Sequence, residues 1–206
     1  NLPKFLIGSF QLKNLSMAIL AAQLCNLDSD KINSVIKNIK NVDGRLNLIK
    51  TFPNNIKVFI DYAHTPDALF EVIKSLKNIY NNNISLVFGC GGDRDFKKRT
   101  LMAKIAKTFC KNIYVTDDNP RRENPNKIRK EIIKNLKGTN YHNIGHRSKA
   151  IKKAILNAKP NEIILIAGKG HENHQDYGSK VISISDKKII RKLKIKKNLI
   201  SQKKQN

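Results

Sequence analysis

The sequence predicts an α/β protein built on a doubly wound, mostly parallel sheet. From residue 44 onward, short apolar segments alternate with amphipathic segments of about 10–15 residues, as in repeated strand–helix–strand units. The most apolar segment, residues 162–167, is typical of a strand buried on both faces of a parallel sheet. The chain has 206 residues, which is enough for one large domain or for one domain and part of another.

The residues before this alternation are predicted to be mainly helical. The expected elements are a strand over residues 2–10, a helix over residues 12–27, and a second helix capped by Asp28-Ser29-Asp30. The sequence Asn41-Val42-Asp43-Gly44 is the best candidate for a linker. We therefore expect residues 1–43 to be the tail of one domain and residues 44–206 to form another.

In the second domain, strands and helices are predicted to follow one another regularly. The strands are expected at residues 45–52, 57–61, 84–88, 113–116, 141–144, 162–167 and 180–185. The helices are expected after Thr65, around residues 101–109, over residues 125–137 and 147–158, and after a cap at Asp186. The first two strands are predicted to form a hairpin, Gly138 to stop a helix, and residues 201–206 to be frayed.

Three polar loops are predicted to meet at the carboxyl edge of this sheet, where ligands bind in open α/β folds. They follow Phe88, Thr116 and Ala167, and their common edge is what indicates a site. The loop over residues 116–122 contains acidic acceptors, an amide and two guanidinium groups. Such a loop could hold a zwitterion, with Asp toward an ammonium group and Arg toward a carboxylate. The alternative is a solvated polar turn.

The formal net charge is +24, from 40 Lys and Arg against 16 Asp and Glu, which by itself suggests nucleic acid or another anionic partner. However, the lysines are spread along the chain, Trp is absent, and Phe and Tyr do not interleave with the basic residues. We therefore expect no specific nucleic-acid binding. A phosphorylated, polycarboxylate substrate remains compatible with the charge.

The cysteines indicate a reducing cytoplasm. Cys25, Cys90 and Cys110 are scattered and form no CxxC pair, which argues against a zinc ribbon or a disulfide framework. The apolar run over residues 17–24 is too short to cross a bilayer, and no secretory pattern follows Asn1. We expect a fragment of a longer cytoplasmic protein, a monomer without membrane insertion.

Two glycine-rich segments resemble phosphate-binding motifs only in part. In Gly89-Cys90-Gly91-Gly92-Asp93-Arg94-Asp95, an arginine stands where the dinucleotide fingerprint needs its third glycine. We interpret it as a loop that approaches an anion, with Arg94 as the specific contact; the alternative is a structural turn. Gly168-Lys169-Gly170 lacks the spacing of a Walker loop, so any ATP chemistry must take its main phosphate cradle from outside these residues.

Two further segments carry polar groups at strand ends. In His171-Glu172-Asn173-His174 the histidines lie three residues apart, not four as in the zinc motif HExxH, so Glu172 is better interpreted as an acceptor for a substrate ammonium group than as part of a metal site. Asp61 could accept hydrogen bonds from ribose hydroxyls, with His64 close by. The alternative is that Asp61 and Thr65 are only capping groups.

Taken together, these segments resemble the Mur ligase family of ATP-dependent amide ligases. The matching pieces occur in the family's order: Gly44-Arg45, Asp61-Tyr62-Ala63-His64-Thr65-Pro66-Asp67, Gly89 to Asp95 with Lys98-Arg99, Asp118-Asn119-Pro120-Arg121, and Ala167-Gly168-Lys169-Gly170-His171-Glu172. Two departures concern nucleotide contacts. Gln11 replaces the first Asn of the family's FNxxN pattern, and Asn47 replaces the carboxylate of its GRME pattern.

The resemblance implies which residues hold the incoming amino acid. They are Arg94, Asp118, Asn119, Pro120, Arg121, Gly168 and Glu172. In this family, Asp-Asn-Pro-Arg marks enzymes that use meso-diaminopimelate, and lysine-adding relatives lack the arginine. The alternatives are a lysine-adding or other Mur-like ligase, of the folylpolyglutamate or cyanophycin type, and a non-catalytic basic module that binds nucleic acid.

The resemblance also implies ATP and Mg²⁺ as cofactors. Arg45 would face the phosphates of ATP and Asp61 its ribose, with His64 nearby. Residues 1–43 would be the end of a central ATPase domain. The family's Walker loop, uridine-nucleotide site and carbamylated lysine would lie outside this chain, which is therefore expected to be inactive alone.

Overall fold

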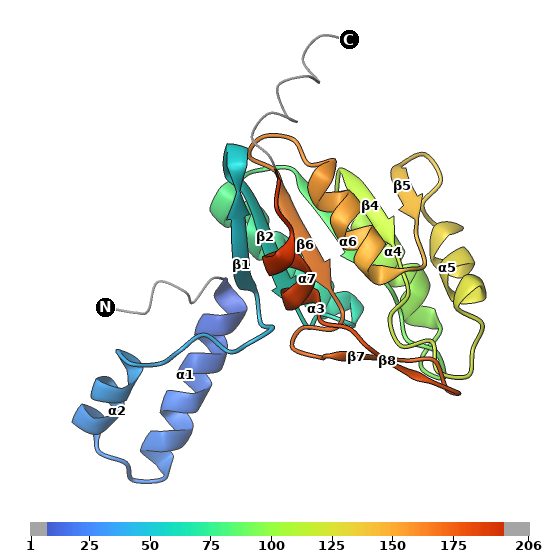
Figure 1. Ribbon diagram of the computed structural model, residues 1–206. Coiled ribbons are helices and arrows are strands. Elements are labelled where there is room, and N and C mark those ends of the chain that lie inside the picture. The colour runs from blue at the N-terminus through green and yellow to red at the C-terminus, as the bar shows by residue number, and fades with distance from the viewer. Residues whose placement is uncertain (1–7, 196–206) are drawn as a thin grey trace.

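A six-stranded sheet forms the centre of the computed structural model, which describes residues 8–195 of the chain (Figure 1). The strands are β1 (Asn47–Phe52), β2 (Ile56–Asp61), β3 (Ile84–Phe88), β4 (Asn112–Val115), β5 (Asn140–Asn143) and β6 (Ile163–Ala167). Their order is β1-β2-β6-β3-β4-β5. All neighbours from β2 to β5 are parallel, and only β1 runs antiparallel, in the predicted hairpin with β2. The predicted fold class is confirmed.

The most apolar strand lies between β2 and β3, although it is the last of the six in the chain. All residues of β6 are buried, and they alternate between the two faces of the sheet. Ile163 and Leu165 pack on the side of α3 (Pro66–Tyr80), α4 (Lys97–Phe109) and α5 (Pro125–Ile133). Ile164 and Ile166 pack on the side of α6 (Arg147–Leu156) and α7 (Asp186–Lys192). Helices therefore cover both faces (Figure 1).

The first two described helices form a pair outside the sheet (Figure 1). They are α1 (Ser9–Leu24) and α2 (Ser29–Ile36), and Asp28 caps α2 as predicted, since its side chain accepts hydrogen bonds of 3.0 Å from the amides of Asp30 and Lys31. The predicted strand over residues 2–10 is wrong at residues 9 and 10, which are helical. Gly8, with a φ of 98°, is the N-cap residue of α1. Residues 2–7 of that prediction lie outside the described residues.

A separate two-stranded hairpin lies across the carboxyl edge of the main sheet (Figure 1). It pairs β7 (His174–Asp176) with β8 (Val181–Ser183), the core of the predicted strand 180–185. The pattern does not reveal β7, because its three residues are polar. Ser185, not Asp186, caps α7, because the Asp186 side chain turns inward to an arginine.

Of two other predicted helix ends, the start of α3 is confirmed and the end of α5 is wrong. Thr65 caps α3 as predicted, accepting from the Ala68 amide at 3.3 Å. Helix α5 ends at Ile133, four residues before the predicted end at residue 137, and Gly138 with a φ of 79° closes the following turn. The frayed end predicted for residues 201–206 lies beyond the described part. No helix in residues 8–195 combines the length and apolarity that a membrane crossing requires.

Candidate functional site

A cavity of about 390 Å³ opens at the carboxyl edge of the sheet, between the loops that follow β2, β3, β4 and β6. The predicted convergence of loops is therefore found. The predicted site residues that line it are His64, Arg94, Asp118, Asn119, Arg121, Gly168 and Glu172. A larger cavity of about 520 Å³ lies between α6, α7 and β8, but it contains none of these residues. The cavity at the sheet edge is the better candidate because cations, anions and amide groups converge on it.

The loop after β4 is a fixed part of the fold. Residues Thr116 to Pro120 are all buried, so the alternative of a solvated turn is wrong. The Thr116 amide donates to the carbonyl of Phe88 at 3.0 Å, which ties the loop to β3. From β7, the Gln175 side chain donates to the carbonyls of Asp117 and Asp118, at 3.0 and 2.8 Å. The β7–β8 hairpin, which was not predicted, therefore holds this loop in place through Gln175.

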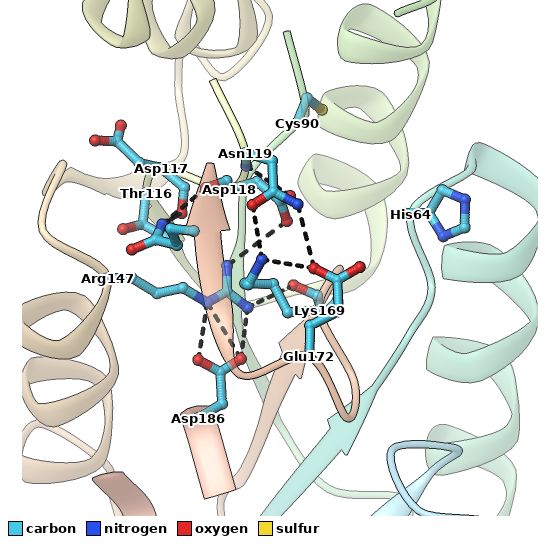
Figure 2. A network of polar contacts seen from close by, with 12 residues as sticks. His64, Cys90, Thr116, Asp117, Asp118, Asn119, Arg147, Lys169, Glu172 and Asp186 are labelled. Atoms are coloured by element: carbon cyan, nitrogen blue, oxygen red, sulfur yellow. Dashed lines mark hydrogen bonds and ion pairs between the residues drawn. The ribbon is translucent and has the colours of Figure 1, made fainter. Parts of the chain in front are cut away.

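The two aspartates of this loop point in different directions (Figure 2). Asp118 lines the cavity, and its Oδ1 accepts from the Asn119 amide at 2.8 Å. Asp117 bonds to Arg129 of α5 and accepts from the hydroxyl of Tyr177 at 3.0 Å. Burial and the Asp117 carboxylate raise the pKa of Tyr177 to about 12. Of the two, only Asp118 is placed to face a ligand.

The glycine loop after β3 is pressed against the loop after β4. A Cβ at Gly89 would lie 2.2 Å from the Thr116 carbonyl oxygen, and one at Gly92 would lie 1.9 Å from that of Pro120. These two positions therefore require glycine because another backbone passes within contact distance. Arg94 follows on the exposed rim of the cavity. Its contact with an anion stays a prediction.

Arg121 occupies an unusual backbone conformation, with a φ of 53° that L residues seldom adopt. Its amide donates to the Asp176 carbonyl at 2.9 Å, so β7 helps to hold this geometry. Within residues 8–195, both hydrogen bonds of its guanidinium leave from Nη1, to the carbonyls of Gly92 at 2.8 Å and Asn119 at 3.5 Å. Its Nε and Nη2 donors therefore remain for a ligand. The side chain of the neighbouring Arg122 is exposed.

A network of three residues adjoins the cavity: Asn119 and Glu172 line it, and Lys169 joins them (Figure 2). Lys169, which is 1% exposed, donates from Nζ to Asn119 Oδ1 at 2.9 Å and to Glu172 Oε2 at 2.7 Å. Asn119 Nδ2 donates to Glu172 Oε2 at 3.2 Å. Partial burial opposes ionisation of Glu172, but the hydrogen bond and charge of Lys169 and the bond from Asn119 outweigh it, so the pKa of Glu172 is lowered. The sequence reasoning identified Asn119 and Glu172 but missed the lysine that joins them.

Arg147 is a second buried cation that the sequence reasoning did not single out (Figure 2). It is fully buried at the start of α6 and donates three hydrogen bonds of 2.8 to 3.1 Å to the Asp186 carboxylate. It also donates to the carbonyl of Ala167 at 3.0 Å, at the end of β6. Its Nη1 lies 3.9 Å from Asp118 Oδ2. Arg147 therefore supports the cavity from below, where α6, α7 and β6 meet.

Gly168 lies directly against the carboxylate of Asp118. It has a φ of 109°, and a Cβ there would lie 2.6 Å from Asp118 Oδ2. Both the conformation and the contact therefore require glycine. The position was predicted as a site residue, and the structure supplies the physical reason for the residue type.

The predicted nucleotide-binding residues lie at one side of the cavity. Asp61 is 4% exposed, and its carboxylate accepts from the amides of Leu46 at 2.6 Å and Ala63 at 2.7 Å. Burial raises the pKa of Asp61 and the two amide bonds oppose this. The Asp61 carboxylate thus caps two backbone amides, while its contact with ribose stays a prediction. The exposed Arg45 stacks on the ring of Tyr62 at 4.6 Å, and His64 stands apart from the network (Figure 2).

The described residues contain no group of three or more His, Cys, Asp or Glu side chains arranged to hold a metal ion. In the cavity, the Glu172 carboxylate is already bonded to the ammonium of Lys169. The donor set of this part of the chain therefore does not fit Mg²⁺, and no chemical step is assigned to the ion here.

A curated relative and a solved structure that resemble this chain carry the same enzyme name. A protein of Rickettsia felis named UDP-N-acetylmuramoyl-L-alanyl-D-glutamate–2,6-diaminopimelate ligase is 45% identical over 190 residues, which are 91% of this chain and 35% of that protein. A solved structure with the same enzyme name has a TM-score of 0.69 at 34% identity, covering 98% of this chain and 40% of that one. This chain therefore spans well under half the length of these relatives.

Folylpolyglutamate synthase of Mycobacterium tuberculosis shares the fold, with a TM-score of 0.63 at 19% identity over 81% of this chain and 38% of that one. The family profile described as "Mur ligase, glutamate ligase domain" matches residues 44–170. Because this match covers more than half of the 206 residues, the chain belongs to the Mur ligase family.

Proposed function

We propose that this chain is the C-terminal part of an ATP-dependent ligase that adds meso-diaminopimelate to UDP-N-acetylmuramoyl-L-alanyl-D-glutamate in peptidoglycan precursor synthesis. Residues 1–43 would end the central ATPase domain and residues 44–206 would form the domain that binds the amino acid. The observation that carries the proposal is that one cavity is lined both by Arg121, whose guanidinium keeps donors free, and by the hydrogen-bonded Asn119–Glu172 pair. The ligase names of the relatives support it.

The reaction has two steps. The glutamyl carboxylate of the nucleotide precursor attacks the γ-phosphorus of ATP, which forms an acyl phosphate and releases ADP. The amino group of diaminopimelate then attacks the acyl carbon and phosphate leaves, so that an amide bond forms. The part of this chain is to bind the amino acid and aim its amine, which is catalysis by positioning.

The charges of the cavity suit a zwitterion with an additional carboxylate. Glu172 would receive an ammonium group, and Arg121 the distal carboxylate that distinguishes meso-diaminopimelate from lysine. A ligand without that carboxylate would leave the half-buried Arg121 unpaired, at a cost of roughly 2–5 kcal/mol. Arg94 is exposed at the rim and would add to the selection only if it moved onto the ligand.

The nucleotide would lie at the Asp61 side of the cavity. Arg45 is exposed next to it and would meet phosphate, while Asp61 retains lone pairs for ribose hydroxyls beside its two amide bonds. Closure over ATP would be a hinge motion near residues 42–44. The magnesium that the family resemblance implies would be held by phosphate oxygens and by residues outside this part of the chain.

The test is an incorporation assay with a protein of full family length that carries this chain. We expect turnover with UDP-N-acetylmuramoyl-L-alanyl-D-glutamate, ATP and meso-diaminopimelate, and little with L-lysine. Equal or greater use of L-lysine would refute the substrate assignment. The 206-residue chain alone is expected to show no turnover, and activity of this chain alone would refute its assignment as a part of the enzyme.

We further propose that the enzyme acts as a cytoplasmic monomer. Nucleic acid is not expected as a specific partner despite the net charge of +24. High-affinity binding to DNA or RNA, with an affinity that falls steeply as the salt concentration rises, would contradict this part of the proposal.

A further inference from the structure

The lysine beneath the cavity is held in a position that few lysines occupy. The side chain of Lys169 is 1% exposed, between two glycines whose φ values are 109° and 52°. A buried ammonium group is stable only where it is paired and hydrogen-bonded. Its partners here are Asn119 and Glu172, both of which line the cavity. The lysine therefore acts on the ligand space through two other side chains.

The first consequence is the orientation of the Asn119 amide. Its Oδ1 receives Lys169 Nζ at 2.9 Å and the backbone amide of Asp176 at 3.0 Å. Both partners can only donate, so the atom that meets them must be the amide oxygen. The amide nitrogen then lies on the other side, 3.2 Å from Glu172 Oε2. One of its two hydrogens serves Glu172, and the other is left for an acceptor in the cavity.

The second consequence concerns Glu172. Its Oε2 takes the bonds from Lys169 and Asn119, while Oε1 lies 3.3 Å from the hydroxyl of Tyr62. The pairing with Lys169 also helps to lower the pKa of Glu172 despite its partial burial. Glu172 therefore presents a charged acceptor beside the donor of Asn119.

We propose that Lys169 is a positioning residue for the amino-acid substrate, which it does not touch: it turns the Asn119 amide N–H toward the cavity and holds the Glu172 carboxylate in place. An amino acid is then bound with an ammonium group at Glu172 and a carboxylate at Asn119. This inference rests on the proposed ligase function. It differs from a purely structural role, in which Lys169 would only offset the charge of Glu172 in the folded protein.

The test compares Lys169→Met with Lys169→Arg. The matched control is Lys180→Met, which changes an exposed lysine in the turn between β7 and β8. All are made in a protein of full family length. In Lys169→Met, KM for meso-diaminopimelate is expected to rise about tenfold or more, while KM for ATP stays within about twofold. The acid limb of kcat/KM for the amino acid is expected to move to higher pH, because Glu172 loses its cation. Lys169→Arg should recover part of both effects, and Lys180→Met should show neither.

Two results would overturn the inference while leaving the proposed function intact. One is a Lys169→Met enzyme with unchanged KM for the amino acid, and the other is a uniform loss of kcat with an unchanged pH profile. A wild-type enzyme that does not use meso-diaminopimelate would overturn both proposals. If Lys169→Met does not fold, the neutral double variant Lys169→Met/Glu172→Gln is measured by thermal unfolding and kinetics. A stable double variant with wild-type affinity for the amino acid would refute both the inference and the role that the proposed function gives to Glu172.

Discussion

The Arg147–Asp186 pair offers the sharpest test of how the site is built into the fold. Arg147 is fully buried and Asp186 is 2% exposed. Replacing Arg147 by Met removes three hydrogen bonds of 2.8, 2.9 and 3.1 Å to Asp186 and one of 3.0 Å to the Ala167 carbonyl. A carboxylate is then left buried without its cation, which costs about 3–5 kcal/mol. This is a large part of the roughly 5–15 kcal/mol that stabilises a typical folded protein.

The assay is urea unfolding of the chain followed by circular dichroism, with thermal unfolding as a second measure. At about 2–4 °C per kcal/mol for a chain of this size, Arg147→Met should lower Tm by roughly 6–20 °C. The double variant Arg147→Met/Asp186→Leu replaces the pair by apolar groups and should recover about half of the loss or more. Arg191→Met, an exposed arginine of α7, is the control and should change stability by less than about 0.5 kcal/mol. A loss below about 1 kcal/mol in Arg147→Met would refute the reasoning.

Three further predictions concern single positions. Gly168→Ala, at a φ of 109° and with a Cβ 2.6 Å from a carboxylate oxygen, should cost about 1–3 kcal/mol in urea unfolding and weaken amino-acid binding, whereas Gly138→Ala, with open space around it, should affect stability alone. The hydrogen bond from Arg99 is the main cause that lowers the pKa of Glu123 below 4.5. The ionised Glu123 should therefore stabilise the fold above pH 4.5, and this stabilisation should be lost as the pH falls through the lowered pKa. In Glu123→Gln the free energy of unfolding should change less between pH 6 and pH 3 than in the wild type, and an unchanged pH dependence would contradict this. Only the exposed Cys25 should react with a thiol reagent at pH 8, because burial raises the pKa of the other two cysteines to about 12; fast labelling of more than one thiol before urea is added would be the contrary result.

The sheet was predictable because its strands are short apolar runs at regular spacing. The buried strand 162–167 was recognised, and so was the edge where the loops meet. The position of this strand between β2 and β3 was not predicted, because strand order depends on contacts far apart in the sequence. The hairpin strand β7 was missed for a different reason. Its three polar residues carry no apolar alternation, yet one of them, Gln175, is buried against the loop after β4.

The site was predicted as a set of residues but not as a network. Asn119, Arg121 and Glu172 do meet in one cavity. Two of the buried cations, Arg147 and Lys169, were not singled out, because Arg and Lys are almost never fully buried unless they are paired. The partner of Arg147 is 39 residues away in the chain, so no local pattern reveals the pair. For Lys169 a local signal did exist, since it stands between two glycines at a strand end and three residues before Glu172.

The most direct test of the central claim compares Arg121→Ala with Arg122→Ala in a protein of full family length. The measured quantity is the ratio of kcat/KM for meso-diaminopimelate to that for L-lysine. Arg121 has free guanidinium donors in the cavity and Arg122 is exposed beside it. We predict that Arg121→Ala lowers kcat/KM for meso-diaminopimelate by roughly 30-fold or more and removes most of the preference, while Arg122→Ala stays within about twofold of the wild type. An Arg121→Ala enzyme that uses meso-diaminopimelate as well as the wild type would contradict the assignment of this loop.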